Sequence, residues 1–117
     1  GEPWIKVNPN YIVINAEDQL KDRNSVFYYY KQLIALRKQY ELICFGDFEL
    51  LLPENKQIFA YRRFNGSQMI KVICNFTDKE AVYDSTEDQA YELLLANYDD
   101  KKTDGNLRPY EARVFIK

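Results

Sequence analysis

The side chains that most often perform nucleophilic or metal chemistry are scarce in this sequence. It contains no histidine and only two cysteines, Cys44 and Cys74, which lie far apart. Without imidazole, neither a Ser/His/Asp triad nor a Cys/His pair can form. A structural zinc site usually needs four Cys or His ligands and a redox site a CxxC pair, so we expect no metal site and no cofactor. Both cysteines lie in apolar strings, which favours reduced, buried thiols over the alternative of a disulfide.

Carboxylates are the other groups that could perform acid–base chemistry. The chain has 18 acidic and 16 basic residues among 117, and adjacent acids include Glu87–Asp88 and Asp99–Asp100. These pairs stand in polar, turn-like segments, where neighbouring carboxylates are usually solvated. We therefore predict no catalytic residue in this chain.

Charge and hydropathy argue against two classes of partner. The net charge is −2 and no block of Lys or Arg occurs, which is unlike a nucleic-acid-binding protein. No apolar run approaches the roughly 20 residues needed to span a bilayer. Residues 1–4 resemble neither a natural start nor a signal peptide. We expect no nucleic-acid or membrane partner, a cytoplasmic location, and a chain that is a piece of a longer protein.

The first 40 residues combine an irregular segment with one long helix. Residues 2–24 are punctuated by Pro3 and Pro9 and could form a short helical turn over 16–20. Residues 25–39 predict the helix, with Asn24 or Ser25 as its N-cap. Its apolar residues form two stripes, which indicates two apolar neighbours. The larger stripe contains Val26, Tyr29, Tyr30, Leu33, Leu36 and Tyr40, and the smaller contains Phe27 and Ile34.

From residue 45 onward the hydrophobic period changes to two, which predicts strands. We expect them over 48–52, 57–64, 68–76, 80–84, 91–96 and 110–117, with a hairpin at Asn65–Gly66. Two strands place their apolar residues on one face, which should be the core face. These sets are Ile70, Val72, Cys74 and Phe76, and Tyr110, Ala112, Val114 and Ile116 opposite Glu111, Arg113 and Lys117. The predicted fold class is mainly β with one long N-terminal α-helix, the β part being an antiparallel sandwich or meander.

Six strings carry a family resemblance over nearly the whole chain. They are PWIKVNPNY (3–11), SVFYYYKQLIALRK (25–38), IFAYR (58–62), VICNF (72–76), LLANYD (94–99) and LRPYEARVF (107–115). In order, spacing and content they strongly resemble the end of the oligo-1,6-glucosidases of the α-amylase superfamily, glycoside hydrolase family 13. Dextran glucosidases, trehalose-6-phosphate hydrolases and sucrose-cleaving relatives share most of these strings.

The resemblance implies a (β/α)8 barrel followed by a small antiparallel β domain. Residues 1–41 would be the last βα loop and helix of an otherwise absent barrel, and residues 42–117 the C-terminal β domain. The catalytic carboxylates of such enzymes would all lie upstream of Gly1. Because βα loops bind substrate at one face of a barrel, Trp4 and Asn8 are the candidate substrate-binding residues. Packing between neighbouring loops is the alternative role for them.

The resemblance also implies a function for the longer protein. That parent would be a bacterial retaining α-glucosidase that hydrolyses α-1,6-glucosidic bonds of isomalto-oligosaccharides or dextrin ends. This chain would be its non-catalytic C-terminal fragment, would stabilise the catalytic barrel as its partner, and would meet oligosaccharide only through the parent.

Two other functional classes remain open. One is a carbohydrate-binding module, and the other is a stand-alone fold that binds a partner. Binding modules tend to display aromatic residues on a strand face, whereas the strand aromatics here alternate with polar residues as core residues would. A parent of the trehalose-6-phosphate hydrolase, dextran glucosidase or sucrose-cleaving type is a further alternative.

Overall fold

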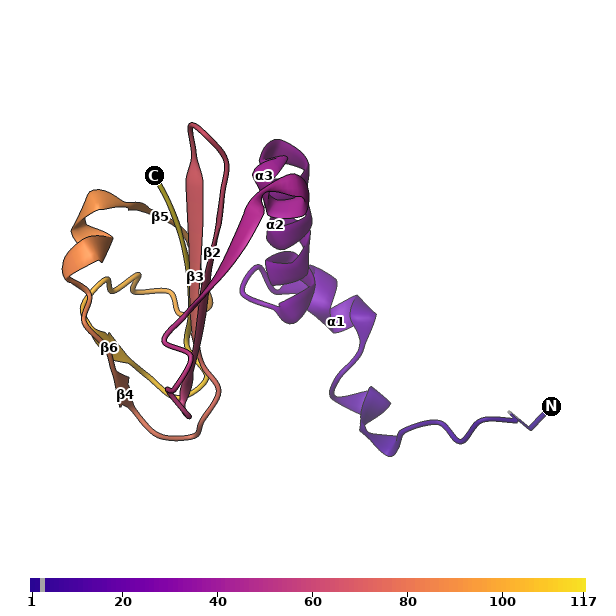
Figure 1. Ribbon diagram of the computed structural model, residues 1–117. Coiled ribbons are helices and arrows are strands. Elements are labelled where there is room, and N and C mark those ends of the chain that lie inside the picture. Colours follow the sequence, from indigo (N-terminus) through magenta and orange to yellow (C-terminus); the bar gives the residue numbers. More distant parts are fainter. Residues whose placement is uncertain (3) are drawn as a thin grey trace. The chain divides into compact units, whose positions relative to one another are not determined.

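The computed structural model describes residues 1–2 and 4–117, so Pro3, which opens the first of the six strings, lies outside the described residues. The chain divides into two compact units, residues 1–39 and residues 40–117. Helices and loops make up the first unit, and strands dominate the second (Figure 1). Within the described residues, no helix has both the length and the apolar character that a membrane crossing requires.

The amino-terminal unit contains three helical segments joined by turns. They are the 3-10 helix η1 (Pro9–Ile12), α1 (Ala16–Lys21) and α2 (Val26–Gln39). The Asn8 Oδ1 atom accepts a hydrogen bond from the backbone N–H of Asn10 at 3.2 Å, and the Asn15 Oδ1 atom accepts one from the N–H of Asp18 at 2.9 Å. Helix starts leave such N–H groups without intrahelical partners, so each asparagine satisfies one of them. The stretch predicted to be largely irregular therefore contains two short helices.

Helix α2 begins at a hydrogen-bonded corner with α1. The Ser25 hydroxyl donates to the backbone carbonyl of Gln19 at 2.7 Å, and the Gln19 Oε1 atom accepts from the N–H of Phe27 at 3.3 Å. The sequence predicts Asn24 or Ser25 as the N-cap of this helix. Ser25 occupies the N-cap position, since its carbonyl accepts a hydrogen bond from the N–H of Tyr29 at 3.1 Å. Its hydroxyl donates to α1, and the Gln19 side chain accepts from an N–H of the first turn.

The carboxyl-terminal unit is built on a five-stranded antiparallel sheet accompanied by a two-stranded one. Its elements are α3 (Leu42–Phe45), β1 (Asp47–Leu51), β2 (Ile58–Phe64), β3 (Met69–Asn75), β4 (Ala81–Val82), the 3-10 helix η2 (Thr86–Ala90), β5 (Glu92–Ala96), β6 (Asn106–Leu107) and β7 (Ala112–Ile116). The larger sheet has the order β1-β2-β3-β7-β5, and β4 pairs with β6. The predicted antiparallel sheet is confirmed. Only β1 to β3 follow a meander, because β7 returns to pair with β3 and leaves β5 at the edge.

The predicted hairpin joins β2 to β3, but its turn is longer than a two-residue Asn-Gly turn. Phe64 lies opposite Met69, and the N–H of Asn65 donates to the carbonyl of Gln68 at 3.0 Å. The Asn65 Oδ1 atom accepts from the N–H groups of Ser67 and Gln68. No glycine among the described residues has a positive φ, which a type I′ turn requires. Side-chain hydrogen bonding by the asparagine therefore shapes this loop.

The core lies between the two sheets of the carboxyl-terminal unit. Its members come from β2, β3, β4, β6 and β7 and from Tyr83, and β4, β6 and η2 lie on the same side of the larger sheet (Figure 1). The buried residues of this cluster are Ile58, Ala60, Ile73, Ala81, Tyr83, Leu107 and Phe115. The two-stranded sheet thus provides the second layer that a five-stranded sheet needs to bury one face.

The predicted distribution of side chains between the two faces is partly wrong. Among the residues assigned to the core face, Ile70 and Val114 are buried, whereas Phe76 and Tyr110 are exposed. The charged residues Glu111 and Arg113 were assigned to solvent, but both are completely buried. The alternation of residue types predicts the strands correctly. It fails for the charged side chains, because ionic groups can be buried when they are paired.

Asn75 connects the end of β3 to two neighbouring segments. Its Nδ2 group donates to the carbonyls of Lys79 at 2.6 Å and Arg108 at 2.9 Å, and lies 3.4 Å from that of Leu107. Its Oδ1 atom accepts from the N–H and the hydroxyl of Thr77. The amide therefore uses both kinds of hydrogen-bonding group that it possesses. This one buried side chain holds the turn after β3 and the end of β6 together.

Gly46 joins α3 to β1 in a place with no room for a side chain. A Cβ atom there would lie 2.6 Å from the carbonyl oxygen of Leu42 and 2.9 Å from that of Phe64. We expect Gly46→Ala to lower the free energy of unfolding by about 1–3 kcal/mol, because backbone would have to move. At Gly66 an added Cβ meets nothing within 4 Å, so Gly66→Ala should stay within about 1 kcal/mol of the parent chain. Urea denaturation compares them, and equal stability of the two variants would contradict the prediction.

Candidate functional site

Trp4 and Asn8, the candidate substrate-binding residues, both lie in the amino-terminal unit. The Trp4 side chain is 95% exposed. Asn8 is also exposed, and its Oδ1 atom is engaged by the N–H of Asn10. Asn8 therefore has a structural task in starting η1, while the Trp4 ring presents nearly all of its surface. Contact with a sugar stays a prediction for both residues.

A second group of polar residues forms a buried ionic network beside β7. The Glu111 carboxylate accepts from the Nε atom of Arg108 and from the Nε atom of Arg113, each at 2.9 Å. Arg113 also donates to the carbonyls of Asp104 at 2.5 Å and Asn106 at 2.7 Å. Burial raises the pKa of Glu111, but the hydrogen bonds from the two arginines outweigh it and lower that pKa from 4.5 to about 2. The network is a structural clamp that fixes the start of β6 on the sheet.

Arg108 extends this network to the protein surface. Its guanidinium bonds Asp100 at 2.7 Å and stacks on the Tyr98 ring, 3.8 Å from the ring centroid. The Tyr98 hydroxyl donates to the carbonyl of Pro109 at 2.9 Å. Planar guanidinium groups combine such stacking with forked hydrogen bonding, which a lysine could not reproduce. Arg108 therefore stabilises the loop before β6 through its contacts with Glu111, Asp100 and Tyr98.

A second ionic cluster lies between β3 and η2. The Lys71 ammonium and the Asp88 carboxylate form a buried ion pair, and the Tyr83 hydroxyl donates to the other oxygen of Asp88 at 2.6 Å. Burial, together with the hydrogen bond to Asp88, raises the pKa of Tyr83 well above its usual range. The sequence-based interpretation of Asp88 as a solvated turn charge is wrong, since its side chain is almost fully enclosed. The neighbouring Glu87 is exposed, as predicted.

A row of aromatic side chains, here called the aromatic row, crosses the face of the larger sheet opposite the core. It consists of Phe48, Tyr61, Phe59 and Phe76, with successive ring centroids 5.5, 5.6 and 6.2 Å apart. The three phenylalanines are exposed. The expectation that the strand aromatics behave as core residues is therefore wrong for this row. Successive rings are inclined by 31°, 49° and 72°, so they form no flat platform.

The two cysteines lie in different elements of the carboxyl-terminal unit, Cys44 in α3 and Cys74 in β3. Both carry thiols, as predicted, and both are half-buried rather than fully buried. Burial raises the pKa of the Cys74 thiol, which lowers its thiolate fraction at neutral pH. Cys74 lies opposite Phe59 in the β2–β3 pairing, so its surroundings are those of a small hydrophobic residue.

Several carboxylates of the described residues are engaged in ion pairs. Glu49 pairs with Arg62 at 2.7 Å, and Glu111 and Asp88 belong to the two buried clusters. Within residues 1–2 and 4–117, no group of three or more His, Cys, Asp or Glu side chains is arranged to hold a metal ion. The described residues thus offer packing surfaces and structural ion pairs.

Comparison with known proteins gives matches over nearly the whole chain. A family model described as alpha amylase, catalytic domain, matches residues 1–46. An oligo-1,6-glucosidase of Bacillus cereus is 47% identical over 121 residues, covering 98% of this chain and 22% of the relative. A trehalose-6-phosphate hydrolase of Bacillus subtilis (strain 168) is 40% identical over 124 residues, with coverage of 98% and 22%.

Solved structures agree with the sequence matches. The crystal structure of Bacillus licheniformis trehalose-6-phosphate hydrolase superposes with a TM-score of 0.87 and 35% identity, covering 99% of this chain and 22% of that chain. The present chain therefore spans about a fifth of the length of the proteins it matches. Over that fifth, the proteins are similar to this chain in sequence, and the solved structure is similar in fold.

These matches define the class: the chain belongs to the α-amylase superfamily, glycoside hydrolase family 13. The expectation drawn from the six strings is confirmed. Within the superfamily the chain is similar to the oligo-1,6-glucosidases, of which the Bacillus cereus protein is one.

The ionic network around Glu111 predicts a specific loss of stability in acid. Its folded pKa of about 2 lies below the ordinary 4.5, so the carboxylate contributes fully above pH 4.5 and its contribution disappears as the pH falls toward 2. That contribution is on the order of 3 kcal/mol. We expect Glu111→Gln to be less stable at pH 7 and to lose this part of the pH dependence. Urea denaturation at several pH values measures both.

Glu54→Gln is the control for this prediction. Glu54 lies in the exposed turn between β1 and β2, so its substitution should leave the pH dependence unchanged. An acid limb that is identical in the parent chain and in Glu111→Gln would show that other groups cause it.

Proposed function

We propose that this chain is the non-catalytic C-terminal part of a bacterial, cytoplasmic retaining α-glucosidase of the oligo-1,6-glucosidase type. The parent would hydrolyse α-1,6-glucosidic bonds of isomalto-oligosaccharides or dextrin ends. Three observations support the proposal: the 47% identity to an oligo-1,6-glucosidase, the coverage of only 22% of that relative, and the absence of histidine. The match of the catalytic-domain model to residues 1–46 supports assigning residues 1–41 to the last βα loop and helix of the barrel.

We further propose that residues 42–117 stabilise the catalytic barrel by packing against it. The observation that carries this role is the aromatic row, which leaves three phenylalanines exposed on the sheet face opposite the core. Phenylalanine has no polar group to hydrogen bond to a sugar. The mutually inclined rings favour interdigitation with another protein surface, since tilted and edge-on contacts are typical of packed aromatics. This argues against the alternative of a carbohydrate-binding module.

Helix α2 supports the same role from the amino-terminal unit. None of its residues is buried, and Val26, Tyr30 and Ile34 are all exposed. A helix with this many exposed apolar side chains usually has a partner surface. We assign that surface to the missing barrel, which is the partner proposed for this chain.

Trp4 and Asn8 are the residues through which the chain would meet substrate. The exposed indole of Trp4 offers a flat apolar face of the kind that packs on a pyranose ring. Asn8 would position this segment through its hydrogen bond to η1 and could present its amide to a sugar hydroxyl.

The proposal predicts that activity belongs to the full-length protein alone. The purified 117-residue chain should hydrolyse isomaltose no faster than buffer does, because the pair of catalytic carboxyl groups that retaining hydrolysis needs would lie in the barrel of the parent. The full-length protein should release glucose in the α configuration, which NMR of the fresh product detects. Inversion at the anomeric carbon, or activity that purifies with the isolated chain, would refute the assignment.

Phe76 tests the packing role of the aromatic row. Its side chain is 67% exposed in this chain, so Phe76→Ser should leave the stability of the isolated chain nearly unchanged. In the full-length protein the same change should lower the Tm by about 2–5 °C, because a buried phenylalanine would be lost from an interface. Thermal denaturation of both proteins measures the effect.

Val82 provides the matched control for Phe76. It is an apolar residue that is 77% exposed, and it lies on β4 in the smaller sheet. Val82→Ser should leave the Tm of the full-length protein nearly unchanged. If Phe76→Ser and Val82→Ser lower that Tm equally, the aromatic row has no special role.

A further inference from the structure

The loop that joins β2 to β3 contains a chemically reactive pair of residues, which plays no part in the function proposed above. Asn65 is followed by Gly66, and it is the one asparagine of the sequence that precedes a glycine. Both residues are exposed, and a Cβ atom added to Gly66 would meet nothing within 4 Å. Solvent therefore reaches both residues, and the backbone at the glycine has room to move.

The carbonyl group of the Asn65 side chain is directed toward the backbone of its own loop. Its Oδ1 atom accepts from the N–H of Ser67 at 3.0 Å, from the Ser67 hydroxyl at 3.2 Å and from the N–H of Gln68 at 2.8 Å. Such donors stabilise the negative charge that develops on a carbonyl oxygen when a nucleophile adds to its carbon. The backbone nitrogen of Gly66 is the nucleophile next to it in the chain, and its attack on Cγ closes a succinimide ring.

We propose that Asn65 is a site of spontaneous covalent modification, at which the side-chain amide becomes an acid. The Gly66 nitrogen loses its proton to hydroxide and forms a bond to Cγ of Asn65, while the Cγ–Nδ2 bond breaks and ammonia leaves with a proton from water. Water then opens the succinimide. Cleavage of the bond between Cγ and the ring nitrogen gives aspartate, and cleavage of the bond between the backbone carbonyl carbon and that nitrogen gives isoaspartate. The whole reaction consumes one water and releases one ammonia.

The modification changes both the charge and the hydrogen bonding of the loop. An ionised acid replaces a neutral amide, so the net charge goes from −2 to −3. In isoaspartate the former side-chain carbonyl becomes part of the main chain, which is longer by one methylene group. The hydrogen bonds that shape the loop are then lost, and the pairing of Phe64 with Met69 beside it should weaken.

Asn55, in the turn between β1 and β2, provides a comparison within the same chain. It is exposed, and its Oδ1 atom accepts from the N–H groups of residues 57 and 58, each at 2.9 Å. Its exposure and its backbone hydrogen bonds therefore match those of Asn65. The residue that follows it is Lys56, whose side chain hinders the approach of the backbone nitrogen to Cγ. The two sites thus differ chiefly in the residue that supplies the nucleophile.

Mass spectrometry of tryptic peptides tests the proposal on the 117-residue chain, sampled over several weeks in mildly alkaline buffer. Trypsin cleaves after Arg63 and Lys71, so Asn65 lies in a peptide of residues 64–71 that contains no other asparagine. We expect its aspartate and isoaspartate forms to accumulate as two chromatographic peaks, at a rate that rises with hydroxide concentration. The Asn55 peptide should change at least about tenfold more slowly. An unchanged Asn65 peptide, or equal rates at the two asparagines, would overturn the proposal.

A second measurement separates the folded loop from the bare sequence motif. Because the loop is exposed, folding should slow the reaction at Asn65 by less than about tenfold relative to the chain unfolded in guanidinium chloride. Stronger protection by the folded state would show that the loop resists ring closure, and it would refute the proposal.

Two substitutions should exchange the reactivity of the two sites. Gly66→Ala places a Cβ atom in open space, so the fold should persist while modification of Asn65 slows by about tenfold or more. Lys56→Gly, at an exposed position, should make Asn55 react within about tenfold of the rate at Asn65. Circular dichroism checks that both variants keep the fold. Unslowed reaction in Gly66→Ala, or an inert Asn55 in Lys56→Gly, would contradict the mechanism.

Discussion

The Glu111 carboxylate, held between two arginines, is the interaction on which the architecture of the β unit depends. Through Arg113 it fixes the carbonyls of Asp104 and Asn106, and so places β6. Strand β6 in turn pairs with β4, and these two strands cover the face of the larger sheet that carries the core. Burying two charged groups, Glu111 and Arg113, has a large desolvation cost, which close hydrogen bonds to charged partners and backbone offset. Loss of one charged group of this network would therefore destabilise the layer that β4 and β6 form.

The sequence predicted where strands occur more reliably than which way they face. Alternation of apolar and polar residues located β2, β3 and β7, because a strand imposes a period of two whatever lies on either side. Assigning the faces requires knowing which polar residues are paired. Lys71 is buried because Asp88, 17 residues away in the sequence, pairs with it, and Arg113 is buried because Glu111 and the carbonyls of Asp104 and Asn106 accept its hydrogen bonds. The two-residue strand β6 and the helical turn η2 were invisible because tertiary contacts, rather than local pattern, define them.

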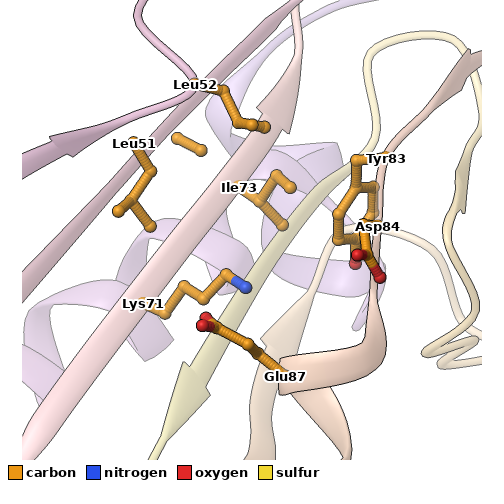
Figure 2. A pocket seen from close by; sticks show the side chains of 8 residues that line it. Leu51, Leu52, Lys71, Ile73, Tyr83, Asp84 and Glu87 are labelled. Carbon is orange, nitrogen blue, oxygen red and sulfur yellow. The ribbon is translucent and has the colours of Figure 1, made fainter.

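The functional features also divide into those that the sequence predicts and those that only the structure reveals. The six family-like strings can be identified in the sequence alone, and they predict the superfamily that the comparisons support. The asparagine that starts η1 could also be expected, since Asn-Pro-Asn favours a capped turn. The pocket that Figure 2 shows beside β2, β3 and η2 could not, because its lining residues come from separate strands and a loop that only the folded topology assembles. The sequence predicts the aromatic row to be part of the core, because alternation with polar residues is the same whether a face is covered by its own chain or by another.

The buried amide of Asn75 has a consequence for how this protein could be produced. Asn75-Phe76-Thr77 has the pattern that acceptor enzymes of the eukaryotic secretory pathway glycosylate on the asparagine nitrogen. In the folded chain that nitrogen is turned inward and hydrogen bonded to backbone carbonyls. A glycan could therefore be attached only before folding, and it would then occupy the place where the turn after β3 and the end of β6 meet. Expression through a glycosylating host would trap the chain in a form that cannot close its own β unit.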